Sequence, residues 1–581
     1  FRRKVAGAYQ DVPTAAFADA GREMALGLVA LGLSPGERVA VLSETRLEWF
    51  EADLAILSAG LISVPIYPTL TENTVEYILK DSGARAIFVS GPQQAAKLDR
   101  FRRETPSFPV IVFDDAAQVE GAMGLEGLRA KGRPLDQAEP DLYRRRADAV
   151  QPDDTATIIY TSGTTGPPKG VMLTHANIVS NVLSGLQIFD LGPADAVLSF
   201  LPLSHILERM AGHYCMWYAG VVIAYAESVD TVSENLAEVH PTVMVSVPRL
   251  YEKIYARIFE SATSGSVIKK GIFFWARSVG LERARRLLSK KPVGPWLRLR
   301  FGIADHLVFS KLRARTGGKL RFFISGGAPL AQDIAEFFYA AGLVILEGYG
   351  LTESSPVLTA NTVTEIRPGT VGKPLPGVEV RLAEDGEILA RGPNIMKGYY
   401  NMPDATAETL QGGWLHTGDI GRWDADGFLI ITDRKKDLIV TSGGKNVAPQ
   451  PIEGALKTDK FITEAVVIGD RRPYLVALIV PNFVNIESYR VVKNLGELSV
   501  AELTRHPRVM DLMRRRIERH QQEAAPYERI RKFHILDHDL SQEAGELTPT
   551  LKVKRKKVVE KYAAQIEALY AEAAGGEPPR A

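Results

Sequence analysis

Cysteine is almost absent from this sequence, since Cys215 is the only one among 581 residues. A single thiol excludes disulfide bonds within the chain and a cysteine-based zinc finger, and it suits a reducing compartment. We therefore expect a cytoplasmic protein.

The chain also lacks an excess of charge of either sign. Its 70 lysines and arginines nearly cancel its 69 aspartates and glutamates, which leaves a formal net charge of +1. A protein that coats a nucleic acid carries a marked basic excess. We therefore predict no nucleic-acid partner, and any basic function must be local.

No run is long and apolar enough to span a membrane. The longest uncharged stretch, residues 210–226, contains His213 and falls short of the roughly 20 apolar residues that a spanning helix needs. A buried helix followed by a strand is the preferred interpretation. The opening residues lead into polar sequence and lack the apolar core of a signal peptide.

What the chain does have is enough apolar sequence for several cores. Its 45% apolar residues can bury large cores, and its 581 residues exceed what a single core holds. Strand-like and helical stretches alternate through the first two-thirds of the chain, for example at 38–42, 49–58, 62–65 and 86–89. This alternation is typical of a layered α/β domain with much parallel sheet.

The pattern changes near Gly377, where short strands are separated by glycine turns and Asp426-Gly427 marks a hairpin. We predict a small β subdomain over about 360–433, which completes a large N-terminal domain over 1–433. The charged residues 434–437 mark the domain boundary. A smaller α+β domain then follows over 438–570, and the tail is 571–581.

The most specific local motif is a glycine- and hydroxyl-rich loop after the strand-like residues 155–159. Glycines let backbone N–H groups curl around an anion, and hydroxyls add donors or a magnesium contact. The spacing is not that of a Walker A loop, which disfavours an ordinary P-loop kinase or ATPase; a flexible surface turn is the alternative. The predicted phosphate-binding residues are Thr161, Ser162, Gly163, Thr164, Thr165, Gly166 and Lys169.

With this loop the sequence resembles the adenylate-forming superfamily of acyl-CoA synthetases, luciferases and peptide-synthetase adenylation domains. The resemblance covers nearly the whole chain and rests on four motifs in family order: the phosphate loop, residues 348–354, residues 414–419, and residues 433–437 with the glycine loop 442–447. It implies ATP, coenzyme A and Mg²⁺ as substrates and cofactor. It also implies a mobile C-terminal domain that turns about a hinge at Lys435 and Lys436.

The second motif offers groups for the nucleotide and its metal. Tyr349 has an aromatic face for adenine, with a core tyrosine in a tight turn as the alternative. The carboxylate of Glu353 and a triphosphate repel each other unless a cation lies between them. We therefore predict that Glu353 and Thr161 bind magnesium. A solvated or helix-capping Glu353 is the alternative. The predicted ATP-binding residues from this region are Gly327, Gly348, Tyr349 and Thr352.

Two further motifs concern the ribose and coenzyme A. Asp419 can accept hydrogen bonds from both ribose hydroxyls and Arg434 can donate to the same sugar, whereas a structural salt bridge between them is the alternative. By resemblance, both residues contact the ribose. The resemblance likewise makes Gly443, Gly444 and Lys445 the coenzyme A-binding loop.

A basic segment near the C-terminus contains the candidate catalytic lysine. A carboxylate that attacks the α-phosphate of ATP brings two anions together, so a cation that bridges them stabilises the transition state. Lys552 matches the catalytic lysine of the family best. The commoner pattern has a glycine before that lysine, which is missing here, so Lys554 competes, and a solvated basic helix face is the third interpretation.

Three segments, 202–210, 246–253 and 254–321, resemble the long-chain fatty acyl-CoA synthetase branch. The resemblance puts His205 at the acyl tunnel as part of the catalytic site, with a core histidine as the alternative. It implies a ligase that makes an acyl-adenylate from fatty acid and ATP, then acyl-CoA and AMP. The alternatives are a same-fold ligase that acylates a carrier protein, and a non-catalytic acyl-adenylate or lipid sensor.

One basic segment raises the question of membrane contact. Residues 265–301 carry ten basic side chains and one acidic side chain, and Ile268, Ile272, Trp275 and Val279 follow helical spacing within it. An apolar stripe beside a basic face is typical of an interfacial helix on anionic lipid, whereas a helix packed on the core is the alternative. We expect peripheral contact with the inner face of a membrane. The oligomeric state is left open.

Overall fold

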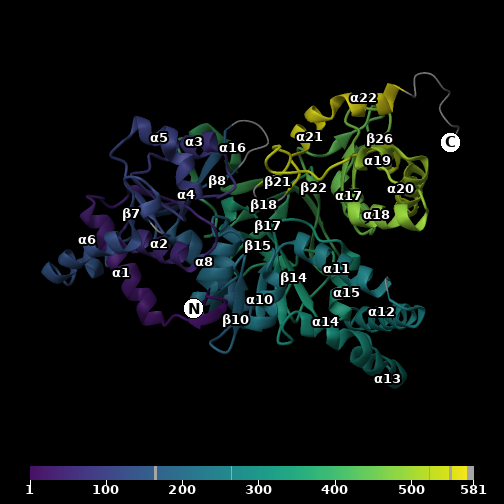
Figure 1. Cartoon of the computed structure of the whole chain (residues 1–581), viewed down its shortest axis with the longest axis horizontal. Coiled ribbons are helices and arrows are strands. Elements are labelled where there is room, and N and C mark those ends of the chain that lie inside the picture. The colour runs from purple at the N-terminus through teal and green to yellow at the C-terminus, as the bar shows by residue number, and fades with distance from the viewer. Residues whose placement is uncertain (115, 162–166, 264, 523, 549–551, 572–581) are drawn as a thin grey trace.

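A computed structural model of the chain describes residues 1–114, 116–161, 167–263, 265–522, 524–548 and 552–571. Two large sheets, a smaller antiparallel sheet and a C-terminal group of strands and helices make up the architecture (Figure 1). The predicted α/β class, with a β-rich portion and an α+β C-terminal portion, is confirmed. The domain boundaries at 433, 438 and 570 stay a prediction.

The first large sheet has the strand order β19-β9-β8-β4-β3-β5-β6-β7 and is parallel from β8 to β7. Its central strands are short runs rich in β-branched residues and are buried on both faces, as parallel strands under helices are. The strands are β3 (Arg38–Leu42), β4 (Ile62–Ile66), β5 (Ala86–Val89), β6 (Val110–Val112), β7 (Met123–Gly124), β8 (Thr155–Thr161), β9 (Lys169–Thr174) and β19 (Gly398–Tyr399).

The second large sheet has the order β16-β15-β14-β13-β12-β10-β11-β1-β2 and is parallel from β14 to β1. Ligands of open α/β sheets bind beyond the carboxyl ends of such strands. The strands are β1 (Arg2–Val5), β2 (Ala8–Asp11), β10 (Ala196–Ser199), β11 (Val222–Tyr225), β12 (Val243–Ser246), β13 (Phe322–Ser325), β14 (Val344–Gly350), β15 (Val357–Ala360) and β16 (Lys373–Pro374).

Helices pack between and around these sheets. The largest core contains Val39 of β3, Val243 of β12 and Ile178 of α8, so both sheets share it. The helices are α1 (Thr14–Ala30), α2 (Leu47–Ser58), α3 (Glu72–Ser82), α4 (Pro92–Ala95), α5 (Asp99–Glu104), α6 (Leu125–Ala138), α7 (Leu142–Asp148), α8 (His175–Ile188), α9 (Cys215–Tyr218), α10 (Val232–Val239), α11 (Pro248–Thr263), α12 (Val267–Leu288), α13 (Pro295–Ala304), α14 (Ser310–Arg315) and α15 (Gln332–Ala340), with the π-helices η3 (Glu208–Tyr214) and η4 (Asp305–Phe309).

The uncharged stretch 210–226 forms η3, α9 and then β11, which confirms the predicted buried helix followed by a strand. Arg209 fixes η3 to the first sheet. It is fully buried, pairs with Asp53 at 2.5 Å and donates to Thr157 Oγ1 at 2.8 Å. Among the described residues, no helix combines the length and the hydropathy needed to cross a membrane.

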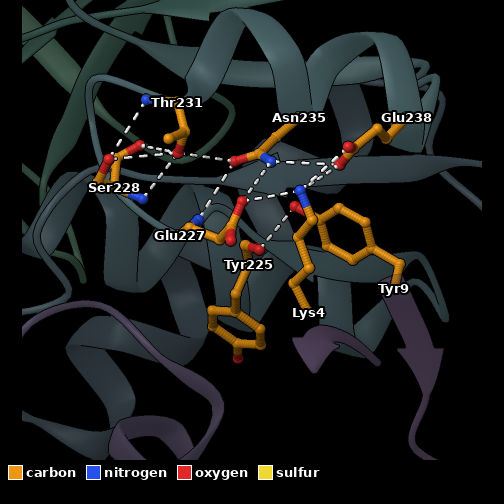
Figure 2. A network of polar contacts seen from close by, with 8 residues as sticks. All are labelled: Lys4, Tyr9, Tyr225, Glu227, Ser228, Thr231, Asn235 and Glu238. Atoms are coloured by element: carbon orange, nitrogen blue, oxygen red, sulfur yellow. Dashed lines mark hydrogen bonds and ion pairs between the residues drawn. The ribbon is translucent and has the colours of Figure 1, made fainter. Parts of the chain in front are cut away.

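The N-terminal hairpin β1–β2 closes one edge of the second sheet. Lys4 Nζ donates to Glu227 Oε2 at 2.8 Å and to Glu238 Oε1 at 3.0 Å, and Tyr9 Oη donates to the Tyr225 carbonyl at 2.9 Å (Figure 2). The hydrogen bonds to the two carboxylates raise the pKa of Lys4, so its charge and these contacts are retained across the neutral range. Residues more than 200 positions apart are thereby tied together.

The small sheet is antiparallel and carries the predicted hairpin at Asp426-Gly427, where Gly427 has φ +78°. Burial alternates along β21, as expected for a strand with one face on a core. The elements are β17 (Glu379–Leu382), β18 (Glu387–Arg391), β20 (Leu410–Gln411), β21 (Trp414–Trp423) and β22 (Leu429–Arg434), with helix α16 (Pro403–Thr409) beside them.

The C-terminal portion has cores of its own around a three-stranded sheet. It lies to one side of the rest of the chain, next to the small sheet and α11 (Figure 1). The elements are β23 (Ile439–Val440), β24 (Asn446–Val447), α17 (Pro449–Lys457), β25 (Ile462–Ile468), β26 (Leu475–Pro481), α18 (Phe483–Val492), α19 (Val500–Arg505), α20 (Pro507–His520), β27 (Ile530–Ile535), α21 (Arg555–Lys561) and α22 (Ala563–Ala571). Of the predicted tail, residues 572–581 lie outside the described residues.

The predicted apolar stripe of α12 is wrong as a single exposed face. Ile268 is 75% exposed, whereas Val279 is fully buried and, together with Ala276, belongs to a core that includes residues of α13 and η4. Trp275 packs against the same core. The second half of the stripe therefore stabilises the fold and is not available to a lipid surface.

Candidate active site

A cavity of about 1220 Å³ opens where the carboxyl ends of β8, β13 and β14 meet the small sheet and the C-terminal portion. Many predicted site residues line it, although they lie far apart in sequence. These are Thr161, Lys169, His205, Gly327, Gly348, Tyr349, Thr352, Glu353, Arg434, Lys435, Lys436 and Lys552. Ser162, Gly163, Thr164, Thr165 and Gly166 lie outside the described residues.

The polar end of the cavity is built around Tyr399, a residue that the sequence interpretation missed. Its hydroxyl donates to Glu353 Oε1 at 2.8 Å, and Lys169 Nζ lies 4.9 Å from its ring centroid. Burial and the adjacent Glu353 raise the pKa of Tyr399, so it remains a hydrogen-bond donor. Tyr399 thus positions the carboxylate that we expect to bind metal.

The donor set suits magnesium. Thr161 ends β8 and Glu353 follows β14, and both face the cavity. One carboxylate and one hydroxyl match a cation that prefers oxygen ligands and keeps phosphate oxygens and waters in its shell. Among the described residues, no three His, Cys, Asp or Glu side chains are grouped so that they could hold a metal ion.

Asp419 and Arg434 are brought together by the pairing of β21 with β22. Arg434 Nε donates to Asp419 Oδ1 at 3.0 Å, and Tyr349 Oη donates to Oδ2 at 2.7 Å. The salt bridge is therefore present. Arg434 and Tyr349 line the cavity, whereas Asp419 is not among its described lining residues. A carboxylate has about four acceptor sites, so these two contacts leave Asp419 capacity to accept from a ribose.

Lys552 of the C-terminal portion lines the cavity. Leu547 pairs with Val553, and Lys552 N donates to Thr548 Oγ1 at 3.0 Å. Burial among cavity residues, and secondarily the charge of Arg434, lower the pKa of Lys552 to about 8. Lys554 is not among the described residues that line the cavity, so the geometry favours Lys552.

His205 reaches the same cavity from the segment before η3. Its Nδ1 accepts the Leu207 N–H at 3.1 Å, which leaves the proton of the neutral ring on Nε2. Burial, and secondarily the charge of Lys552, lower the pKa of His205 to about 4. The ring is therefore neutral at physiological pH and can donate a hydrogen bond from Nε2.

Beyond His205 the cavity becomes apolar between α8 and η3. Gly185 of α8 faces Cys215 there, and a Cβ at this glycine would lie 3.6 Å from the Cys215 sulfur. No local motif marks this branch, because its residues come from separate helices and strands. Its lining residues are Gly185, Phe189, Leu191, Leu207, Met210, Ala211, Cys215, Ile324 and Leu346.

The predicted coenzyme A loop lies elsewhere. Gly443, Gly444 and Lys445 form the turn between β23 and β24, where Gly444 N donates to the Thr441 carbonyl at 2.8 Å. None of the three lines the cavity. Lys435 pairs with Asp385 at 2.6 Å and is thereby fastened to the small sheet.

Contacts join α11 to the C-terminal portion, which also carries Lys552. Lys457 Nζ lies 3.9 Å from Glu252 Oε1 and 3.4 Å from Glu464 Oε1, and Arg249 donates to the Thr463 carbonyl at 3.1 Å. We call Arg249, Glu252, Lys457 and Glu464 the interdomain cluster. Arg249 Nη1 also lies 3.8 Å from Glu252 Oε2 and 3.9 Å from Glu464 Oε2, so the two carboxylates share two cations.

The AMP-binding enzyme model matches residues 4–400, and the model of the AMP-binding enzyme C-terminal domain matches residues 436–574. The chain belongs to the AMP-binding enzyme family. Curated relatives of this family member include the long-chain-fatty-acid–CoA ligase FadD15 of Mycobacterium bovis, 39% identical over 98% of this chain and 94% of the relative. The peroxisomal long chain acyl-CoA synthetase 7 of Arabidopsis thaliana is 33% identical over 95% of this chain and 80% of its own length.

Solved structures support the same fold. The adenylation domain of a carboxylate reductase from Mycobacterium chelonae aligns with a TM-score of 0.73 and 22% identity, covering 97% of this chain and 85% of that domain. ATP-bound MatB from Rhodopseudomonas palustris aligns with a TM-score of 0.66 and 24% identity, covering 96% and 94%. These likenesses concern the fold alone.

Proposed function

We propose that this family member is an ATP-dependent long-chain fatty acid:CoA ligase that forms AMP. The observation that carries the proposal is one cavity that joins an apolar branch to a polar end containing Glu353, Arg434 and Lys552. A fatty acid in the branch would place its carboxylate next to bound ATP. The names of relatives at 33–39% identity agree with this substrate class.

In the first half-reaction, a carboxylate oxygen attacks the α-phosphorus of ATP and the bond to pyrophosphate breaks. Lys552 would stabilise the negative charge that develops between the two anions, and His205 would donate from Nε2 to the acyl carboxylate region. Magnesium held by Glu353 and Thr161 would neutralise phosphate charge. The proposed ATP-binding residues are Thr161, residues 162–166, Lys169, Gly327, Gly348, Tyr349, Thr352, Asp419 and Arg434.

In the second half-reaction, the thiol of coenzyme A loses its proton to solvent, its sulfur attacks the acyl carbon, and the bond between the acyl carbon and the phosphate oxygen breaks to release AMP. We propose that rotation about Lys435 and Lys436 withdraws Lys552 and brings Gly443, Gly444 and Lys445 to the cavity. The anchored Lys435 moves with the small sheet in this scheme, so the rotation begins at Lys436.

We propose a cytoplasmic enzyme that acts at the inner face of a membrane and has no nucleic-acid partner. The single buried thiol, Cys215, supports a reducing compartment. A long-chain fatty acid is itself a membrane-delivered substrate, which supports peripheral contact.

A panel of fatty acids from acetate to stearate, with ATP, magnesium and coenzyme A, tests the proposal by AMP formation. We expect the highest kcat/KM for long chains and strict dependence on coenzyme A. AMP formation that requires a carrier protein would identify the carrier ligase instead. If no fatty acid gives pyrophosphate release, the result would contradict the ligase and favour a non-catalytic lipid sensor.

A further inference from the structure

Helix α13 and the adjoining η4 expose an apolar face that the fold does not use. Trp296 is 69% exposed, Leu299 58%, Ile303 48% and Leu307 39%. Their spacing of three, four and four residues places them along one side of the helix. We call these four residues the α13 face.

The opposite side of the same helix already packs against the protein. Leu297, Ala304 and Phe309 are buried with Val279 of α12 in one core. Folding of α13 is therefore explained without the α13 face. A surface helix normally buries one apolar side and exposes a polar one. A second apolar side that stays exposed therefore indicates an interaction surface.

Positive charge surrounds the α13 face. Between positions 286 and 315 the chain has eight basic residues and one acidic residue, Asp305, an excess of seven. Asp305 is already paired with Arg313 at 2.7 Å. Lys290, Lys291 and Lys311 are exposed, so the surface field around the face is positive.

We propose that the α13 face docks the protein on an anionic lipid bilayer. Apolar residues with a tryptophan enter the acyl boundary of such a membrane, and flanking lysines pair with its headgroups. Figure 1 supports this geometry, because α13 lies at the periphery, away from the small sheet and the C-terminal portion. Docking through α13 would leave the C-terminal portion on the water side, free to rotate.

This inference rests on the proposed membrane contact and assigns it to a surface apart from the ligase cavity. It also corrects the expected docking residues, because Trp275 contributes to the core whereas Trp296 is exposed. A protein partner is disfavoured by the charge, since it would need an acidic surface around an apolar groove. A bilayer with anionic headgroups supplies both negative charge and an apolar interior, and it needs no groove of a specific shape.

Co-sedimentation of the full chain with phosphatidylglycerol-containing and pure phosphatidylcholine vesicles, at low and high salt, tests the proposal. We expect binding to anionic vesicles only, weakened about tenfold or more by Trp296→Ala or by Lys290→Glu with Lys291→Glu. A matched control is Val491→Ser with Val492→Ser on α18, where both valines are exposed, at 64% and 78%.

Each other outcome overturns the proposal. Equal binding to both vesicle types, or unchanged binding of Trp296→Ala, would remove the α13 face as a lipid surface. A sedimentation coefficient of the protein alone that falls in Trp296→Ala would make the face a subunit interface. The melting temperature of each variant checks that it is folded. If Trp296→Ala does not fold, Lys290→Glu with Lys291→Glu carries the test, and its unchanged binding to anionic vesicles would overturn the proposal.

Discussion

At the scale of single residues, the most informative group is Lys552. Its pKa of about 8 means that a growing fraction of the free enzyme loses this positive charge above pH 8. We expect kcat/KM of adenylation to fall above that pH, by about tenfold for each further unit, because only the charged form bridges the two anions. Pyrophosphate release from pH 6.5 to 9.5 measures this.

Replacement of Lys552 separates charge from structure. Lys552→Arg should flatten the alkaline limb, since a guanidinium stays charged, while Lys552→Ala should lower adenylation by about 10²–10³-fold. Synthetic acyl-adenylate with coenzyme A should still react in both variants. Equal loss in both half-reactions would contradict the catalytic role and return Lys554 to consideration.

Glu353 gives a second prediction at this scale. Glu353→Gln keeps the size of the side chain and its contact with the Tyr399 hydroxyl but removes the charge. We expect the magnesium concentration for half-maximal activity to rise about tenfold or more. Glu384→Gln is the control, because this exposed carboxylate also lines the cavity. An identical magnesium titration for wild type and Glu353→Gln would refute the ligand role.

At the scale of elements, α8 and η3 set the size of the apolar branch. Gly185→Leu would fill the space before Cys215, whereas Gly185→Ala places its Cβ at an ordinary van der Waals distance of 3.6 Å. Each methylene that loses its burial costs about 0.8 kcal/mol. We therefore expect Gly185→Leu to lower kcat/KM for stearate at least tenfold relative to octanoate.

The alanine variant is the control for that experiment, because it should retain most of the preference for stearate. A panel of saturated fatty acids from octanoate to stearate measures the shift. If Gly185→Leu lowers activity on all chain lengths equally, the branch does not hold the end of the acyl chain.

Short buried strands were predictable from the sequence. Strands such as β3, β4 and β5 are compact apolar runs whose pattern is local, and the residues of the phosphate end follow a strand in a recognisable order. Lys552 was predicted from the resemblance to the family's catalytic lysine, and it lines the cavity. Local signals sufficed wherever the feature itself is local.

Features that depend on distant pairing were not predictable. Tyr399 reaches the site because β19 pairs with β9, as in the register of Gly398 with Met172, and no local pattern indicates that contact. Asp53 and Arg209 pair across 156 positions. The prediction that the apolar side of α12 is exposed was wrong for a related reason. Helical spacing shows which residues share one side of a helix, but it does not show whether that side packs against another helix.

At the scale of the whole molecule, the interdomain cluster stabilises the arrangement in which Lys552 is at the cavity. Lys457→Met would remove one of the two cations that Glu252 and Glu464 share, and Arg249 would remain. We expect adenylation to fall several-fold relative to thioester formation from synthetic acyl-adenylate, because the competent arrangement becomes less populated. The exposed Lys493→Met is the control. A parallel fall in both half-reactions would show that Lys457 matters only for stability.

The hinge makes a complementary prediction. Lys436→Pro fixes φ near −65° and restricts Lys435 before it, so rotation should be impeded. Adenylate formation should persist while overall acyl-CoA formation falls, measured as pyrophosphate against acyl-CoA. A melting temperature equal to that of the wild-type protein would exclude misfolding, and equal loss of both products would contradict the hinge.

The hairpin held by Lys4 also has a consequence for synthesis of the chain. β1 pairs with β11, whose residues follow about 220 positions later. The ribosome has therefore not yet synthesised β11 when β1 is complete, and β1 cannot pair until then. At 5–20 residues per second this delay is roughly 10–45 s. Ribosome-arrested chains of 150 and 300 residues should therefore differ, with Lys4 protected from amine-reactive labels only in the longer one. Equal labelling of both would mean that the hairpin docks after release.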